Sequence, residues 1–394
     1  MNYHKFKAVS ESPDEGRIAL LERLFASFLV SLSFAKKLDS TYTFIREDEE
    51  IRQRELLAVE QRRKEERDRV EASRRYQREQ MSVELHERVY EQIMQTIDNP
   101  EYILARVLYI QTNSIALLDA VNARAVSLNK LEDLASGLNW LQEGLIRVVN
   151  MPPFADPKDP KRVKVTSLRN AMSFVGTEDL KILIPAFTMQ NWIPKIMEPF
   201  TLLRRKLWEH SLGTAITAQV LAELDGTVDP VHAYVAGMFH DIGKAIITRL
   251  YSMCFDDVQR DMLRELRDEV RSERYNALIE LMPSELFLRN LMVQFERKIS
   301  ANLINSLDLK YLPTRTVHEE FANAEEVEGL SGLARILFQA NRYSEFRMMH
   351  AANLVTTEDG KLMCKEAQLG RHELEVLRTV NLRRLRLSRG TAEE

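Results

Sequence analysis

The chain has 394 residues, which exceeds the usual size of one domain and favours two or three folding units. Its 13 glycines and 12 prolines are few for this length, so the composition favours a mostly helical protein over a sheet-rich one with many tight turns. The net charge of −4 excludes nucleic-acid binding through a general basic field, and 2 cysteines are too few for a disulfide framework or a thiolate zinc site.

The apolar runs are too short to suggest a membrane protein. The longest run near the N-terminus, residues 24–35, contains about a dozen residues, interrupted by serines, and is well short of a bilayer span. It also lacks the basic start and the cleavage pattern of a secretory signal. We therefore expect a cytoplasmic protein with no membrane span and no nucleic-acid partner.

Residues 1–99 predict an N-terminal helical arm. Residues 18–34 have the apolar stripe of an amphipathic helix, and residues 46–91 are strongly charged, with Glu four positions before Lys or Arg in several places, which favours a long exposed helix. A continuous coiled coil fails across residues 61–69, which contain no apolar residue. The arm is thus a solvated connector, or a coiled-coil-like segment that joins two copies into a homodimer or docks a partner.

The next part, residues 100–200, predicts an N-terminal helical subdomain. Asn99-Pro100 marks a break, short helices follow to residue 149, and residues 151–162 form a loop with four prolines. The helical pattern then returns over residues 167–187.

Residues 201–350 predict a second helical subdomain, and residues 351–394 a C-terminal helix and tail. Three core helices are expected over residues 202–224, 230–251 and 256–281. Further helices are expected from residue 284 and over residues 318–324, 329–346 and 373–387. The basic segment at residues 381–389 predicts a frayed amphipathic helix end.

The adjacent pair His240-Asp241 stands inside an otherwise apolar helical pattern. An imidazole beside a carboxylate can chelate a cation, and a carboxylate buried among apolar residues needs a positive partner. Lys244, one turn later, could supply that charge or bind a ligand. His210 precedes His240 by about thirty residues, enough for one helix to end and the next to return antiparallel, so both imidazoles can face one cavity. The pair could hold a metal, hold a ligand or only hold helices together.

These residues resemble the HD superfamily of metal-dependent phosphohydrolases, and more closely its regulatory offshoot, the HDOD (HD-related output) domain. The resemblance rests on AGMFHDIGK at residues 236–244, WEHS at 208–211, LQEGLIRVVN at 141–150 and SLRNAMSFVG at 167–176. It covers roughly residues 100–345 and implies an all-α, HD-like helical bundle preceded by a helical subdomain.

Two departures bear on the chemistry that the resemblance implies. An active HD phosphohydrolase closes its metal site with an Asp from a late helix, but the segment at residues 333–341 places Asn341 there. A neutral amide is a weaker ligand and removes one charge from the site. HDOD domains also often carry Asp-Pro where this chain has Leu138-Asn139.

The resemblance therefore favours a bacterial signalling or regulatory protein that acts by protein–protein contact and not by turnover, with no required cofactor. His210, His240, Asp241 and Asn341 would form a vestigial site that could still hold a divalent metal or a nucleotide ligand, with Lys244 as a further ligand-binding candidate. The alternative is a metal-dependent phosphohydrolase acting on a nucleotide or cyclic dinucleotide, and a third is a scaffold that dimerises through its arm.

Overall fold

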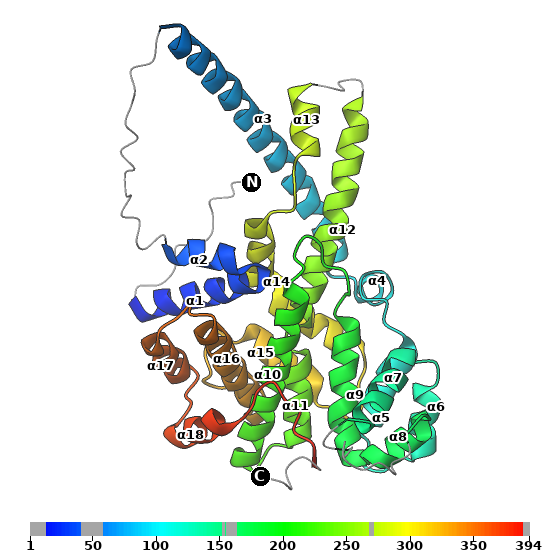
Figure 1. Ribbon diagram of the computed structural model, residues 1–394. Coiled ribbons are helices and arrows are strands. Elements are labelled where there is room, and N and C mark those ends of the chain that lie inside the picture. The colour runs from blue at the N-terminus through cyan, green and yellow to red at the C-terminus, as the bar shows by residue number, and fades with distance from the viewer. Residues whose placement is uncertain (1–12, 41–57, 152–153, 155–163, 268–271, 389–394) are drawn as a thin grey trace.

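The computed structural model describes residues 13–40, 58–151, 154, 164–267 and 272–388. Regular secondary structure in these ranges is helical and includes no strand, so the predicted all-α class is confirmed. Figure 1 shows a body of packed helices from which the N-terminal half of one long helix, α3, extends. Across the described ranges, none of the helices combines the length and the apolar character needed to cross a bilayer.

The helices follow one another with mostly short connections. The first group is α1 (Pro13–Val30), α2 (Leu32–Ser40), α3 (Ala58–Thr96), α4 (Pro100–Tyr102) and a π-helical turn (Ile103–Val107). The second group is α5 (Thr112–Ala120), α6 (Leu128–Ala135), α7 (Asn139–Val149), α8 (Leu168–Val175) and α9 (Thr177–Trp192). The third group is α10 (Leu203–Asp225), α11 (Pro230–Phe239), α12 (Ile242–Glu265), α13 (Glu273–Ile279), α14 (Glu285–Ser306), α15 (Thr314–Asn323), α16 (Gly332–Ala351), α17 (Thr357–Glu366) and α18 (Arg371–Thr379).

The long charged helix α3 has two different halves. Side chains at 66–76 are exposed, as the charge pattern predicts, whereas Met81, Leu85, Val89 and Ile93 are buried against α12 and α13. The imidazole of His86 on α3 lies 3.0 Å from the Tyr251 hydroxyl, a contact that ties the second half to the body. Residues 46–57 of the expected helix lie outside the described residues, and self-association through the arm stays a prediction.

The first amphipathic segment is two helices, not the single helix expected over residues 18–34. Ser31 interrupts it because its hydroxyl oxygen accepts the Phe34 N–H at 3.1 Å and so caps α2. The apolar face of α1 packs with α14, α16 and α17, where it joins buried side chains of the C-terminal part: Met349, Leu354, Val355 and Met363. In Figure 1, α1 therefore lies beside α16 and α17, apart from α3.

The largest hydrophobic cluster runs through the middle of the molecule. It includes buried side chains on both sides of residue 200, among them Leu145, Leu183, Leu207 and Ile246. The division into residues 100–200, 201–350 and 351–394 stays a prediction.

The sequence-based boundary within residues 230–281 is wrong, and the correction matters for the site. A single helix was expected through residues 230–251, but α11 ends at Phe239 and α12 begins at Ile242, continuing to Glu265. The break falls on His240-Asp241. Apolar periodicity did not reveal this break because residues on both sides of it are buried.

Helices α10 and α11 approach closely at Gly237. A Cβ added there would meet the Ala215 backbone at 2.8 Å, inside normal contact. We expect Gly237→Ala to destabilise the fold by roughly 1–3 kcal/mol through overpacking, measured by urea unfolding. The control is Gly16→Ala on α1, where a Cβ meets nothing within 4 Å and helix propensity favours Ala by about 1 kcal/mol. Equal effects of the two substitutions would contradict this packing.

The C-terminal tail is not the helix expected over residues 373–387, because α18 ends at Thr379. The following segment crosses the body instead: Leu387 is buried, Arg386 pairs with Glu223 at 2.8 Å, and the Ser388 hydroxyl donates to Asp179 at 2.7 Å. Docking against these acceptors outweighs the local helical pattern.

Candidate functional site

The break between α11 and α12 places the predicted pair at a helix junction. His240 is the C-terminal cap residue of α11, and Asp241 is the N-terminal cap residue of α12. Both side chains are buried and point toward His210 of α10 and Asn341 of α16. The four predicted residues thus lie together, and Asn341 comes from the late helix that the sequence suggested.

Five polar atoms from four side chains converge in this cluster. The Asn341 Oδ1 atom lies 3.0 Å from the Nε2 atoms of both His210 and His240. The two Nε2 atoms are 3.2 Å apart. The carboxylate of Asp241 lies 3.1 Å from His210 Nε2 and 3.4 Å from His240 Nε2. One small cation could contact all four side chains.

Most of these atoms present lone pairs. Burial lowers the pKa of His240 to about 3, and its Nδ1–H donates to the Gly237 carbonyl at 2.8 Å, so Nε2 is an acceptor. The Asn341 amide nitrogen donates to Glu345 Oε1 at 3.2 Å, which turns the amide oxygen toward the imidazoles. Acceptors packed this closely repel one another unless a proton on His210 Nε2 or a cation lies among them.

The arrangement fits a divalent cation in its spacing. Ligand atoms about 2.0–2.2 Å from a metal lie roughly 3–3.5 Å from one another, and the contacts above fall in that range. Among the described residues, His210, His240 and Asp241 are the group of His, Cys, Asp or Glu side chains whose ligand atoms all lie within 4.8 Å of one another. Two imidazoles with two oxygens suit a borderline transition metal better than Mg²⁺ or Ca²⁺.

Lys244 lowers the affinity that the cluster would have for a cation. Its Nζ lies 2.6 Å from Asp241 Oδ2 and 2.5 Å from Glu296 Oε2. Burial would raise the pKa of Asp241, but His240 and Lys244 hold it well below its ordinary value. Burial would lower the pKa of Lys244, but Asp241 and Glu296 raise it. The ammonium thus already offsets the one carboxylate in the cluster.

Glycine at position 243 explains how Glu296 reaches Lys244. A Cβ at Gly243 would collide with the Glu296 carbonyl, and the Gly243 N–H donates to Ser300 Oγ at 2.9 Å. Helix α14 therefore rests directly on the backbone of α12. Burial raises the pKa of Glu296 to about 7, against the opposing effect of Lys244.

A second layer of charges surrounds Asn341. Arg342, buried on α16, contacts Glu345 at 3.1 Å, Glu22 of α1 at 2.5 Å and Glu366 of α17 at 2.9 Å. Burial would raise the pKa of Glu22, but Arg342 lowers it below its ordinary value. Arg342 therefore holds α1 and α17 to α16 and fixes the Glu345 that orients Asn341.

Helix α1 covers the cluster. The Phe25 ring lies 4.7 Å from the His210 ring between centroids, and Lys244 Nζ lies 6.0 Å from the centre of the same Phe25 ring. A cavity of about 1120 Å³ outside the cluster is bordered by α1 and reaches Lys244, Glu296 and Glu345. Lys244 and Glu345, which contact Asp241 and Asn341, line this cavity, whereas none of the four cluster residues does.

The comparison with known families agrees with this geometry. Residues 109–278 match the HDOD domain family. This stretch of the chain is an HDOD domain. HDOD domains are related to the HD phosphohydrolases, and the match includes His210, His240, Asp241 and Lys244 but ends before α16 and Asn341.

Solved structures resemble the chain at low identity. An HDOD domain protein of unknown function from Geobacter sulfurreducens matches with a TM-score of 0.42 and 17% identity, over 72% of this chain and 93% of that chain. A provisionally named phosphohydrolase from Shewanella amazonensis SB2B matches with a TM-score of 0.41 and 19% identity, over 71% of this chain and 97% of that chain. No curated protein matches the chain.

The Asn-ending segment of the HDOD domain has a structural role. Asn150 follows α7, and its side chain accepts the Val165 N–H at 3.0 Å and donates to the Val165 carbonyl at 2.8 Å. It thereby joins the two ends of the proline-rich stretch. The asparagine thus acts as a backbone clamp and not as part of the polar cluster.

Sequence reasoning missed four charged residues around the HDOD cluster: Glu22, Glu296, Arg342 and Glu345. One signal was present, because Asn341 and Glu345 are four positions apart on a predicted helix and so lie on one face. Arg342 lies next to Asn341 on the same helix, whereas Glu22 and Glu296 belong to α1 and α14, and no sequence spacing links them to the cluster.

Outside the cluster, His318 of α15 is expected to make the stability of the protein depend on pH. It is buried, and burial lowers its pKa to about 4, below the unfolded value of about 6.5. The contribution of His318 to stability is therefore fully present above about pH 6.5 and is lost as the pH falls toward 4. We expect His318→Gln to flatten the slope of unfolding free energy between pH 6.5 and 5, by up to about 1.4 kcal/mol per unit. Exposed His372→Gln should leave the slope unchanged; an unchanged slope in His318→Gln would contradict the assignment.

Proposed function

We propose that this HDOD protein regulates a partner protein through contact, and that its HD-type cluster does not turn over a phosphoester. The observation that carries the proposal is that the cluster is buried and covered by a side chain of α1. The imidazoles and Asp241 are buried, Asn341 stands where the resemblance implies an acid, and Phe25 covers His210. A hydrolytic site needs an open position for water and a path for substrate.

Helix α1 is the element that we expect to carry the signal. It touches the cluster through Phe25 and the charged layer through Glu22, so a shift of α10 or α16 changes its contacts directly. Its release would expose an apolar stripe formed by Leu21, Leu24, Phe28 and Leu29. An amphipathic helix of this kind can dock in the groove of a partner protein.

Metal-dependent hydrolysis of a nucleotide or cyclic dinucleotide is the second candidate, because the four convergent side chains have ligand-like spacing. His210, His240, Asp241 and the Asn341 oxygen would hold the ion. When bound, a divalent cation would supply Lewis-acid chemistry toward a phosphoryl oxygen. The chain's own contribution would be to hold the ligands in place through Lys244 and Glu345.

Metal analysis and turnover assays on the full chain separate the two. We expect less than stoichiometric metal, and hydrolysis of nucleotides and cyclic dinucleotides no faster than in His240→Ala/Asp241→Ala. Phe25→Ala is assayed in parallel, so that cover by α1 cannot hide activity, and His232→Ala on α11 serves as the control. A stoichiometric transition metal, with hydrolysis abolished only in the double variant, would establish the enzyme instead.

A further inference from the structure

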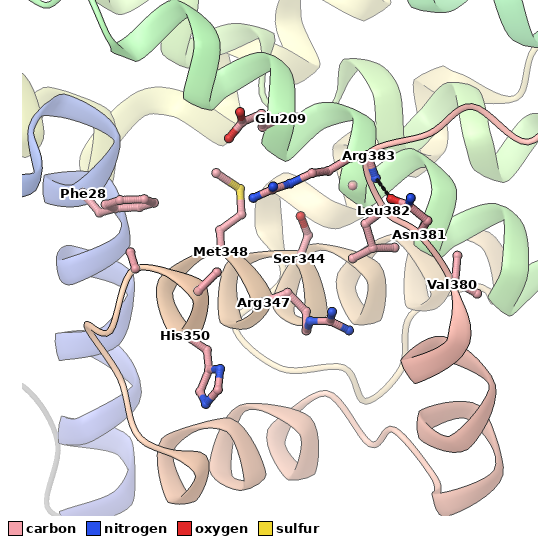
Figure 2. A pocket seen from close by; sticks show the side chains of 13 residues that line it. Phe28, Glu209, Ser344, Arg347, Met348, His350, Val380, Asn381, Leu382 and Arg383 are labelled. Carbon is pink, nitrogen blue, oxygen red and sulfur yellow. Dashed lines mark hydrogen bonds between the residues drawn. The ribbon is translucent and has the colours of Figure 1, made fainter. Parts of the chain in front are cut away.

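A separate cavity of about 500 Å³ adjoins the HD-type cluster (Figure 2). It lies between α1, α10, α16 and the segment that follows α18. Its floor includes Ser344, whose hydroxyl lies 3.0 Å from His210 Nδ1, whereas the Nε2 atom of the same ring faces Asn341. One imidazole therefore connects the cavity and the cluster.

The cavity lining is rich in donors. Arg347 and His350 come from α16, Asn381 and Arg383 from the segment after α18, and Ser344 adds a hydroxyl, whereas the lining has one carboxylate, Glu209. Arg347 donates to the Tyr343 hydroxyl, and within the described residues neither Arg347 nor Arg383 forms an ion pair. Figure 2 shows Arg383 extending across the cavity toward Met348 and Glu209.

The walls between these donors are apolar. They include Phe28 of α1, Met348 of α16, and Val380 and Leu382 of the C-terminal segment. A volume of this size is typical of a small-molecule site, and guanidinium groups bind phosphate and carboxylate through paired hydrogen bonds.

We propose that this cavity binds a small amphipathic anion, with a phosphate or carboxylate head near Arg347 and Arg383 and an apolar, aromatic-sized body against Phe28 and Met348. The donor excess selects an acceptor-rich head. The Glu209 carboxylate repels an anionic head group, so a ligand whose head lies far from Glu209 binds best.

Ser344 gives such a ligand a route to the cluster. Its hydroxyl can donate to His210 Nδ1, which leaves the imidazole proton on Nε2, among the acceptors of the cluster. Alternatively, the Ser344 oxygen can accept a hydrogen bond from His210 Nδ1–H while its own O–H donates elsewhere, for example to the His210 carbonyl at 3.3 Å. In this arrangement His210 Nε2 carries no proton. An anion that accepts a hydrogen bond from the Ser344 hydroxyl favours the second arrangement, in which the His210 proton lies on Nδ1 and Nε2 is free to contact a cation.

Binding in the cavity does not depend on whether the cluster is catalytic; its use as a control input rests on the proposed regulatory function. Calorimetry with 1-naphthyl phosphate and 1-naphthoate tests the binding site, with neutral 1-naphthol and inorganic phosphate as the two half-ligands. We expect either anion to bind at least tenfold more tightly than either half-ligand. Equal binding of 1-naphthol would overturn the anion site, and a preference for one head identifies phosphate or carboxylate as the natural group.

The matched variants are Arg347→Gln/Arg383→Gln, within the lining, and Arg371→Gln/Arg384→Gln, outside it. The first pair should weaken binding of 1-naphthoate by roughly 10–100-fold, and the second should not. Equal weakening in both would show a nonspecific charge effect and overturn the proposal.

The coupling between the cavity and the cluster is measured separately, as the affinity of the protein for Mn²⁺ with and without 1-naphthoate. We expect the anion to tighten Mn²⁺ binding about fivefold or more, and Ser344→Ala to bind the anion but lose that effect. An equal effect in Ser344→Ala would overturn the route through Ser344. Release of 1-naphthol from 1-naphthyl phosphate, abolished by His240→Ala/Asp241→Ala, would contradict the regulatory function while leaving the anion site standing.

Discussion

Asn341→Asp combined with Glu345→Gln is expected to turn the cluster into a tight metal site. The new carboxylate would lie 3.0 Å from both imidazole Nε2 atoms, and the amide introduced at position 345 could donate the hydrogen bond that now runs from Asn341 to Glu345. The double substitution leaves the net charge unchanged but moves one negative charge from position 345 onto a ligand atom at position 341, which should raise affinity for Mn²⁺ or Zn²⁺ by roughly 10–100-fold. The measurement is the shift of Tm with metal, since metal at 100 times Kd stabilises by about 2.7 kcal/mol.

The single substitution Asn341→Asp should behave differently. Without Glu345→Gln it sets two buried carboxylates against each other, and we expect a loss of roughly 3 kcal/mol in metal-free protein that metal restores. Asn139→Asp, at the exposed start of α7, is the matched control and should change neither stability nor metal affinity. If the double variant binds metal no better than wild type, the cluster of four side chains is not a latent metal site.

Arg342→Gln is expected to cost the fold roughly 3–5 kcal/mol, because it leaves Glu345 buried and Glu366 half-buried without their cation and leaves Glu22 with Arg297 at 3.4 Å. Urea unfolding measures the loss, and hydrogen exchange should show α1 opening first. The loss should shrink as the pH falls from 7 to 5, because the unpaired carboxyl groups then take up protons.

Arg335→Gln is the matched control on the same helix. Arg335 pairs with Asp225 at 2.8 Å but is half-exposed, so its loss should cost at most about 1 kcal/mol. Arg342→Gln/Glu22→Gln/Glu366→Gln should recover part of the lost stability, because it removes two of the three carboxylates that Arg342 pairs with and leaves Glu345 alone. A triple variant as unstable as the single one would mean that packing of the Arg342 side chain, and not its charge, holds α1.

Much of the fold could be predicted from residue patterns. The scarcity of glycine and proline and the helical periodicity led to the all-α class, and Pro230 and Ser284 marked helix starts that the structure contains. These signals are local, because capping and periodicity depend on neighbours within one or two turns. The break at His240-Asp241 escaped prediction since both helices are apolar on the sides that pack, and the tail escaped because its partners Asp179 and Glu223 lie far along the chain.

The candidate site divides in the same way. His210, His240, Asp241 and Asn341 could be named from sequence because each stands in a short pattern, and the structure brings the four together. Whether they hold a metal stays a prediction, as does the role of Lys244.

The order of the residues thus specified a helical chain, the pair His240-Asp241 and the neutral amide at position 341. Only the folded arrangement showed that Glu345 turns that amide, that Lys244 already neutralises Asp241, and that Phe25 covers His210. The chemical identity of a residue is fixed by the sequence alone. The free energy of a buried charge depends instead on the partners that packing brings from α1, α14 and α16.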